Sequence, residues 1–246
     1  MQHWSDSAIV LKAKKISEYD GIVTVLTKEH GKQNAVVKGA YSKRMRPFLE
    51  QGNVVHVVYK SRTEEQLGMF ALEGDFNPSA TILGHSGKLT ALSAACSVID
   101  KSLVMGQNVD DVYDVFKSLL TTLDSDYWVK SYCQWEVALL SELGVRLDFS
   151  SCAGNGSTES LIYVSPKSAR AVSAVAGQIY KKKLLPLPQF LLGHGGGITG
   201  LNAYESLMMT GHFLHQSLME HGIKELPEVR GRLKDYFYNR ENKVIG

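Results

Sequence analysis

A ten-residue segment in the first quarter of the chain, VKGAYSKRMR at residues 37–46, combines four basic side chains with a tyrosine. Lys43, Arg44 and Arg46 can neutralise phosphate groups and release their counterions. Tyr41 can stack on an unpaired base. We therefore predict a nucleic-acid contact, and its residues are Lys12, Lys14, Lys15, Lys38, Tyr41, Lys43, Arg44 and Arg46. The alternative interpretation is a solvated loop without a ligand.

Basic residues are unevenly distributed along a chain that is almost neutral. The 246 residues include 27 Lys and Arg and 25 Asp and Glu, which gives a net charge of +2. Residues 12–46 nevertheless hold nine basic and three acidic residues, and residues 160–200 hold five basic residues and no acidic one. These two segments, rather than the total charge, indicate a polyanionic partner.

The glycine-rich segment 195–200, GGGITG, matches the GxGxxG pattern of dinucleotide-binding loops. Such a loop follows a β-strand within a βαβ unit, whereas PLPQFLL precedes this one. A nicotinamide oxidoreductase is therefore an alternative that the sequence disfavours. We predict no cofactor.

Residues with metal-binding or catalytic side chains do not form a complete site. His212 and His215 lie three apart on an expected helix, but no neighbouring Cys or Asp completes a metal site. Cys152 has no visible base, and its distance from Cys96 and Cys133 indicates neither a zinc pair nor a disulfide framework. Asp110 and Asp111 are interpreted as a helix cap. We predict no metal, no catalytic residue and no enzyme.

The first 80 residues show the pattern of short strands separated by turn residues. β-branched and aromatic runs occupy 8–13, 22–27, 34–38, 54–59 and 67–72, with glycines between or just beyond them. Five strands with short connections favour a small antiparallel barrel over βαβ units. A five-stranded OB-fold barrel has this size.

Apolar residues three and four apart predict helices after residue 80. The expected helices cover 88–103, 109–123, 127–143, 201–221 and 229–238, and a short strand is expected at 161–164. The predicted fold class is α+β, with an OB-fold domain at 1–80, a mostly α-helical domain at 81–246 and a small insertion at about 148–185. No apolar amino-terminal run or membrane span is visible, which favours a cytoplasmic protein.

Several stretches of this sequence resemble the bacterial recombination mediator family RecO. Trp4 followed by AIVLKAKKISEYDGIVTVLTKEHGKQNAVVKGAYSKR resembles the opening of that family, and residues 9–44 are the most specific match. The other stretches are WEVALLSELGVRLDFSSC at 135–152, YVSPKSARAVS at 163–173, LLPLPQFL at 184–191 and, more loosely, residues 222–237. Zinc-binding members of the family have four clustered cysteines, of which only Cys152 is present here. The insertion is therefore expected to be a metal-free, degenerate zinc ribbon.

The resemblance implies a DNA repair and recombination mediator that binds single- and double-stranded DNA and anneals complementary strands. It further implies that the protein acts with RecR to load RecA onto DNA coated by single-strand-binding protein. That protein ends in an acidic tail with an apolar residue, so its binding site is expected to combine basic and apolar groups. Candidate residues are Lys130, Trp135, Lys181, Lys182 and Lys183. A protein-interaction adaptor with little intrinsic DNA binding is the alternative.

Overall fold

The computed structural model describes residues 2–63, 66–109, 111–193 and 197–243, with the side chains of 75–76 and 241–243 excepted. The chain divides into two compact units, Met1–Ser125 and Asp126–Gly246. The strand-rich region ends at Phe76, and the first unit also includes the helices that follow it. The predicted domain boundary at residue 80 stays a prediction.

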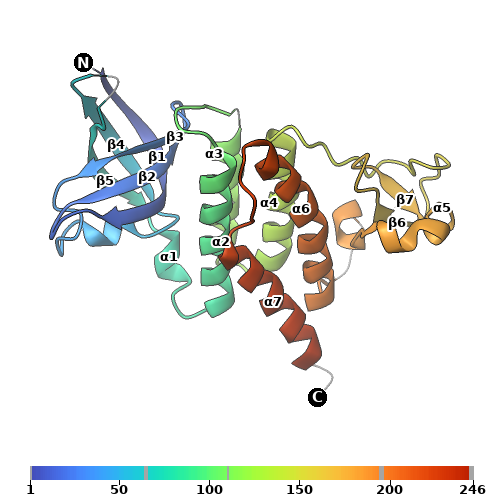
Figure 1. The fold of residues 1–246 in the computed structure, drawn as a ribbon. Helices are drawn as coiled ribbons and strands as arrows, with labels where there is room; N and C mark the ends of the chain where they lie inside the picture. Colours follow the sequence, from blue (N-terminus) through green and yellow to red (C-terminus); the bar gives the residue numbers. More distant parts are fainter. Residues whose placement is uncertain (1, 64–65, 110, 194–196, 244–246) are drawn as a thin grey trace. The chain divides into compact units, whose positions relative to one another are not determined.

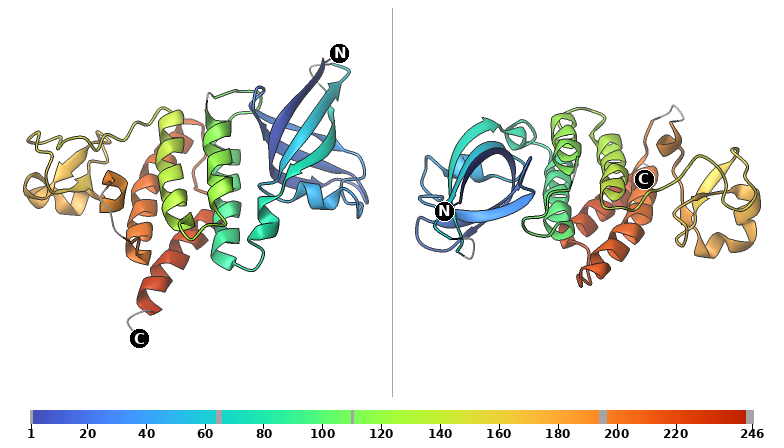
Figure 2. Two further views of the ribbon diagram at one scale, coloured as in Figure 1. Left: turned by 180° about the vertical axis from the view of Figure 1, so that it is seen from behind. Right: turned by 90° about the horizontal axis from the view of Figure 1, so that it is seen from above.

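Five strands of the first unit form a closed barrel in the order β1-β2-β3-β5-β4 (Figure 1). The neighbours pair antiparallel except β3 and β5, which are parallel and meet at Val36 and Met69. The expected OB-fold barrel is confirmed, and Figure 2 shows its strands curving around one another in the view from above. The strands are β1 (Gln2–Lys15), β2 (Gly21–Thr27), β3 (Lys32–Val37), β4 (Val54–Ser61) and β5 (Met69–Phe76).

Alternating side chains fill the interior of the barrel. Val23 and Val25 of β2 are both 0% exposed and pack with Ala8 and Val10 of β1. This period-two pattern is the one that predicted strands in the sequence. Trp4 extends the core, because its ring stacks with that of Tyr59 at a centroid distance of 4.8 Å.

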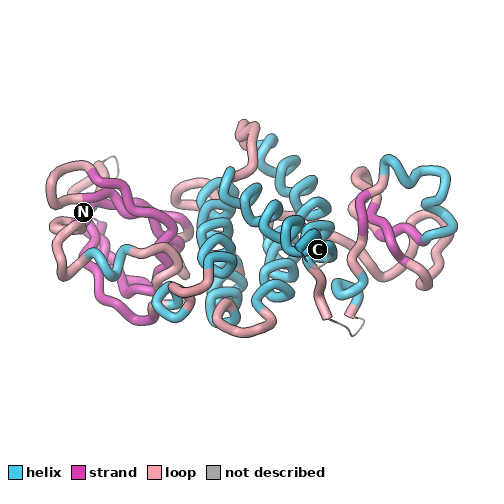
Figure 3. The backbone as a smooth tube through the Cα atoms, turned by 90° about the horizontal axis from the view of Figure 1, so that it is seen from below, coloured by secondary structure: helices cyan, strands magenta, loops and turns pink. Residues whose placement is uncertain are grey.

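Helical segments accompany the barrel within the first unit (Figure 3). A 3-10 helix, η1 (Arg46–Leu49), connects β3 to β4, and three helices follow β5: α1 (Pro78–Thr81), α2 (Ser86–Ser102) and α3 (Val112–Thr122). α2 packs on β1, where the Cys96 Sγ lies 3.8 Å from the Val10 carbonyl oxygen.

The predicted acidic cap of α3 is only partly seen. Asp111 occupies the N-cap position, but its side chain makes no capping hydrogen bond. Its backbone has a left-handed φ of 62°, unlike the extended conformation that normally points a capping side chain at the helix. Asp110 lies outside the described residues.

The second unit combines three longer helices with a three-stranded sheet of order β7-β6-β8. The predicted strand at 161–164 is confirmed as β6. The resemblance of this sheet to a degenerate zinc ribbon stays a prediction. The elements are α4 (Trp128–Glu142), β6 (Leu161–Val164), β7 (Ala171–Ser173), α5 (Ala174–Gly177), η2 (Gln178–Lys183), β8 (Leu185–Pro186), η3 (Gln189–Leu192), α6 (Gly200–Glu220) and α7 (Glu228–Lys243).

A buried ion pair joins the helices of the second unit. The Arg230 guanidinium of α7 donates to both carboxylate oxygens of Glu136 in α4, each at 2.8 Å, and to the Leu207 carbonyl of α6. Glu136 and Arg230 are 0% and 3% exposed. Among the helices that the structure describes, none combines the length and apolar composition needed to cross a membrane.

Candidate nucleic-acid interface

The basic loop predicted from the sequence, residues 38–46, follows β3 and is held by backbone and carboxylate contacts. Gly39 lies two residues after the end of the strand and has a φ of +65°, which glycine adopts without strain. The Asp20 carboxylate accepts hydrogen bonds from the Gly39 amide at 3.0 Å and from Lys38 Nζ at 2.7 Å. The Tyr41 amide donates to the Tyr19 carbonyl at 2.9 Å. The turn between β1 and β2 therefore fixes the start of the basic loop.

Three cations of the basic loop are directed to solvent. Lys43, Arg44 and Arg46 are exposed, and no ion pair engages them within the described ranges. Because they have no acidic partner there, phosphate groups can approach them without displacing one. Exposed cations of this kind can neutralise the phosphate groups of a nucleic acid.

Tyr41 lies half-buried against the barrel. Its ring packs on the barrel core, and a Cβ at Gly21 would lie 3.0 Å from the ring. Lys15 Nζ lies 5.6 Å from the ring centroid, within the range of a cation–π contact. The exposed part of the ring is thus accompanied by a positive charge.

Lys12, Tyr41 and Arg46 line one hollow of about 290 Å³, although β1 and the basic loop are separate in the sequence. We call this surface the basic hollow. Lys14 is exposed on the same strand as Lys12. The complete lining of the basic hollow is Lys12, Ala13, Ala40, Tyr41, Arg46, Leu49, Glu50 and Gln51.

Two of the predicted contact residues have acidic partners. Lys12 Nζ lies 2.6 Å from Asp100 Oδ2, and Lys38 Nζ lies 2.7 Å from Asp20 Oδ2. The Lys38 ammonium and the Gly39 amide hold the pKa of the Asp20 carboxyl below its ordinary value. Both lysine side chains are more than half exposed, at 53% and 67%, so these ion pairs are weak and leave room for a phosphate.

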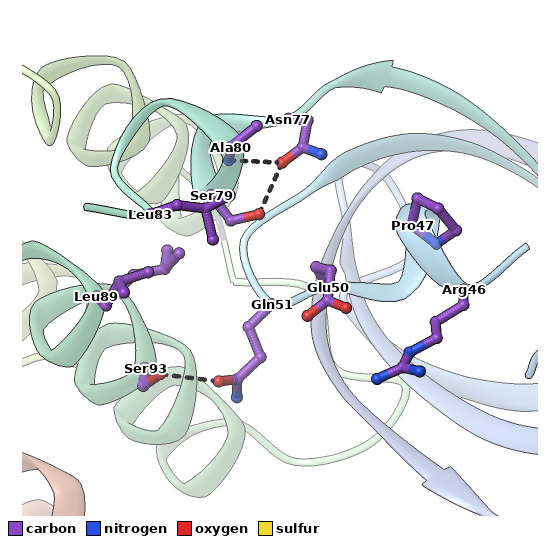
Figure 4. Close-up of a pocket in the computed structure, with 11 residues that line it drawn as sticks. Arg46, Pro47, Glu50, Gln51, Asn77, Ser79, Ala80, Leu83, Leu89 and Ser93 are labelled. Carbon is purple, nitrogen blue, oxygen red and sulfur yellow. Dashed lines mark hydrogen bonds between the residues drawn. The ribbon is translucent and has the colours of Figure 1, made fainter. Parts of the chain in front are cut away.

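A second hollow, which sequence reasoning missed, lies between η1 and the helices α1 and α2 (Figure 4). We call it the helix groove, and its volume is about 490 Å³. No sequence signal indicated it, because its walls come from three separated segments. Its lining is Arg46, Pro47, Glu50, Gln51, Asn77, Ser79, Ala80, Leu83, Leu89, Leu92 and Ser93.

Comparison with known proteins agrees with the barrel and helical architecture. The family model described as the recombination protein O N terminal matches residues 1–71, and that of the recombination protein O C terminal matches residues 86–226. The chain belongs to the RecO family. It is 39% identical to the DNA repair protein RecO of Rhodospirillum centenum over 236 residues, which cover 95% of this chain and 94% of that protein.

Other RecO proteins match over similar lengths. The chain is 39% identical to the DNA repair protein RecO of Caulobacter sp. strain K31, with 94% of this chain and 96% of that protein covered. It is 38% identical to that of Paracoccus denitrificans, with 94% of each chain covered. The chain is therefore a member of a family of DNA repair proteins.

The partner-binding residues predicted from the RecO resemblance differ in accessibility. Trp135 in α4 is only 4% exposed, so it offers little surface to a partner, and Lys130 on the same helix is half-buried. Three consecutive lysines of η2 are exposed, as are the apolar side chains of Val175 and Ile179 just before them, at 78% and 80%. The exposed lysines are Lys181, Lys182 and Lys183.

The two histidines considered as metal ligands and the glycine-rich segment do not form a binding site in the described residues. His215 Nε2 lies 3.0 Å from the Lys224 carbonyl oxygen, and His212 is on the same helix, α6. No cluster of three His, Cys, Asp or Glu suited to a metal occurs in the described part of the chain. Gly195 and Gly196 of the glycine-rich segment lie outside it, and Gly200 begins α6.

Cys152 lies buried beside the three-stranded sheet, at 1% exposure. Its Sγ accepts hydrogen bonds from the amides of Ser173 at 3.2 Å and Gly154 at 3.4 Å. Burial raises the pKa of the thiol, but these hydrogen bonds outweigh burial and lower the pKa to about 7. The sulfur thus serves as a hydrogen-bond acceptor that ties residues 152–154 to β7.

Proposed function

We propose that this chain is a DNA repair and recombination mediator that binds single- and double-stranded DNA and anneals complementary strands. The observation that carries this proposal is the group of exposed cations Lys43, Arg44 and Arg46 beside the basic hollow, where Tyr41 offers an aromatic surface. A basic barrel surface follows the phosphate backbone without reading its sequence.

Annealing of complementary strands follows from the same electrostatics. Two strands repel each other through their phosphates, and bound cations reduce that repulsion while they raise the local strand concentration. The step requires neither a bond to the protein nor a cofactor. The basic residues of the barrel therefore act by charge and position.

The decisive experiment measures binding of a fluorescent single-stranded oligonucleotide at several salt concentrations. In the triple variant Lys43→Ala, Arg44→Ala and Arg46→Ala, we expect the slope of log affinity against log salt to fall by about two to three, because each phosphate contact contributes about one. Annealing without ATP should slow in parallel. An unchanged slope would show that the basic loop does not contact DNA.

We further propose that the chain acts with RecR in loading RecA onto DNA coated by single-strand-binding protein. The acidic tail of that protein would bind the η2 lysines, with its apolar end on Val175 and Ile179. We expect Lys181→Ala, Lys182→Ala and Lys183→Ala together to weaken binding of a tail peptide at least about tenfold. A peptide that binds this variant as tightly as the parent would exclude the η2 lysines.

The exposed side chains of Val175 and Ile179 also suit a protein-interaction adaptor with little DNA binding of its own. The salt titration separates the two functions. An adaptor would bind the oligonucleotide weakly even at low salt, whereas a mediator would bind tightly and lose affinity steeply as salt rises.

A further inference from the structure

We propose that the helix groove receives an unstacked nucleobase of a single strand whose phosphates contact the basic loop. This inference rests on the proposed DNA-binding function and deepens it, because it assigns a base-binding site next to the phosphate contacts. It predicts that the groove distinguishes single strands from duplexes and some bases from others.

The two walls of the helix groove differ in chemistry. Leu89 and Leu92 come from α2, and Leu83, which is 68% exposed, comes from the turn between α1 and α2. Arg46 and Glu50 come from the opposite side, as Figure 4 shows. The volume of about 490 Å³ exceeds that of one nucleobase. A flat base can therefore lie against the leucine wall with its polar edge toward η1.

The helix groove is continuous with the proposed phosphate contacts. Arg46, Glu50 and Gln51 line both the helix groove and the basic hollow. A strand with one phosphate at Arg46 would thus pass from the hollow to the groove within a short length of backbone. The adjacent basic side chains and the apolar wall favour a nucleic-acid strand, whose base is uncharged. An acidic protein segment in the groove would be repelled by the carboxylate of Glu50.

Most amide groups of the helix groove already have partners. The Gln51 amide accepts from Ser93 Oγ at 3.0 Å and donates to the Leu11 carbonyl at 2.9 Å. Asn77 Oδ1 accepts from the Ala80 amide at 3.1 Å and from Ser79 Oγ at 2.7 Å.

The Glu50 carboxylate, unlike the amide groups of Gln51 and Asn77, accepts no hydrogen bond from the residues that the structure describes. A carboxylate accepts hydrogen bonds from the amino groups of cytosine and adenine. Thymine has no amino group, and carbonyl oxygens flank its single ring N–H. The groove is therefore expected to prefer cytosine and adenine to thymine.

The first test replaces the exposed leucine. In Leu83→Ser we expect affinity for single-stranded DNA to fall about tenfold, because the base loses apolar contact. Affinity for duplex DNA should not change, since paired bases cannot enter the groove. The control Val104→Ser removes a side chain that is 50% exposed in the same unit but outside the groove, and it should bind both forms like the parent.

The second test concerns base preference. The parent should bind a deoxycytidine homopolymer more tightly than a thymidine homopolymer of equal length, and Glu50→Gln should reduce this ratio, because an amide donates to thymine as readily as it accepts from cytosine. Equal ratios in the two proteins would overturn the role of Glu50.

The outcomes separate this inference from the proposed function. A parent without salt-dependent DNA binding would contradict the proposed function itself. A parent that binds DNA, together with a Leu83→Ser variant that binds both forms unchanged or loses both equally, would overturn the base-binding site alone.

Discussion

The buried side chain of Arg230 links α7 to α4 and α6 in the second unit. It forms two hydrogen bonds with Glu136, which also accepts from the hydroxyl groups of Tyr132 and Thr210. Burial alone would lower the pKa of Arg230, but the Glu136 carboxylate raises it above its ordinary value. Removal of either charge would leave the other buried without a counter-ion, so the network is stable only when both residues are present.

Removal of this arginine should therefore strongly destabilise the second unit. We expect Arg230→Met to lower the free energy of unfolding by about 3–5 kcal/mol, since Glu136 would remain buried without its counter-ion. Urea unfolding monitored by circular dichroism measures this loss. The control Arg232→Met removes a side chain that is 68% exposed and should cost less than about 0.5 kcal/mol. Equal stability of the two variants would contradict the structural role of the ion pair.

Cys152 should make stability depend on pH. Hydrogen bonds lower its pKa in the folded state from 9.0 to about 7 against the effect of burial, so the unfolded chain binds more protons between these values. The contribution of the thiolate is present above pH 9 and is lost as the pH falls through 7. We expect the stability difference between the parent and Cys152→Ser to increase from pH 7 to pH 9. A difference that is constant over this window, measured by urea unfolding, would argue against a stabilised thiolate.

At the scale of elements, η1 is positioned by its packing against β5. A Cβ at Gly74 of β5 would lie 2.3 Å from the Phe48 ring of η1, so only glycine permits this close approach. The same short helix begins with Arg46, which lines both the basic hollow and the helix groove. The packing of one strand on η1 therefore determines where Arg46, a proposed phosphate contact, is placed.

Gly74→Ala should displace η1 and lower the stability of the first unit. We expect a loss of about 1–3 kcal/mol in the free energy of unfolding, with a weaker affinity for single-stranded DNA, because Phe48 must move away from the new methyl group. The control Gly84→Ala has no atom within 4 Å of the added Cβ and should leave stability unchanged. Addition of Phe48→Leu should restore part of the loss. Failure of that second change to restore any stability would show that Phe48 is not the obstacle.

The element positions were largely predictable because burial imposes periodicity on the sequence. Residues 55–61 alternate between buried and more exposed positions and lie in β4, and residues 201–220 repeat apolar side chains at helical spacing and lie in α6. Short elements such as η1 and α5 were not predicted, since a single turn is too short to show a period. Trp135 was a candidate partner-binding residue, yet it is only 4% exposed within its helix.

At the scale of the whole molecule, the net charge of +2 contributes little to attraction for DNA. Affinity must then depend on where the cations lie rather than on how many there are. The exposed loop cations provide such a local concentration, whereas Lys12 and Lys38 are partly compensated by neighbouring carboxylates.

Two variants of equal net charge test this dependence on position. Lys43→Ala, Arg44→Ala and Arg46→Ala together should reduce DNA affinity steeply at low salt. Lys224→Ala, Arg232→Ala and Arg240→Ala remove the same charge from exposed positions outside the proposed contact residues and should have little effect. Equal losses of affinity would indicate that overall charge governs binding.

The sequence by itself determined the strand and helix order, the OB-fold barrel, the RecO family and the basic loop, because each of these depends on patterns among residues that are close along the chain. The tertiary structure alone decided that Lys12 pairs with Asp100, that Trp135 is buried and that Arg46 lies between the basic hollow and the helix groove. These contacts join residues far apart in the chain, and their geometry follows from packing, for which a local pattern carries no signal.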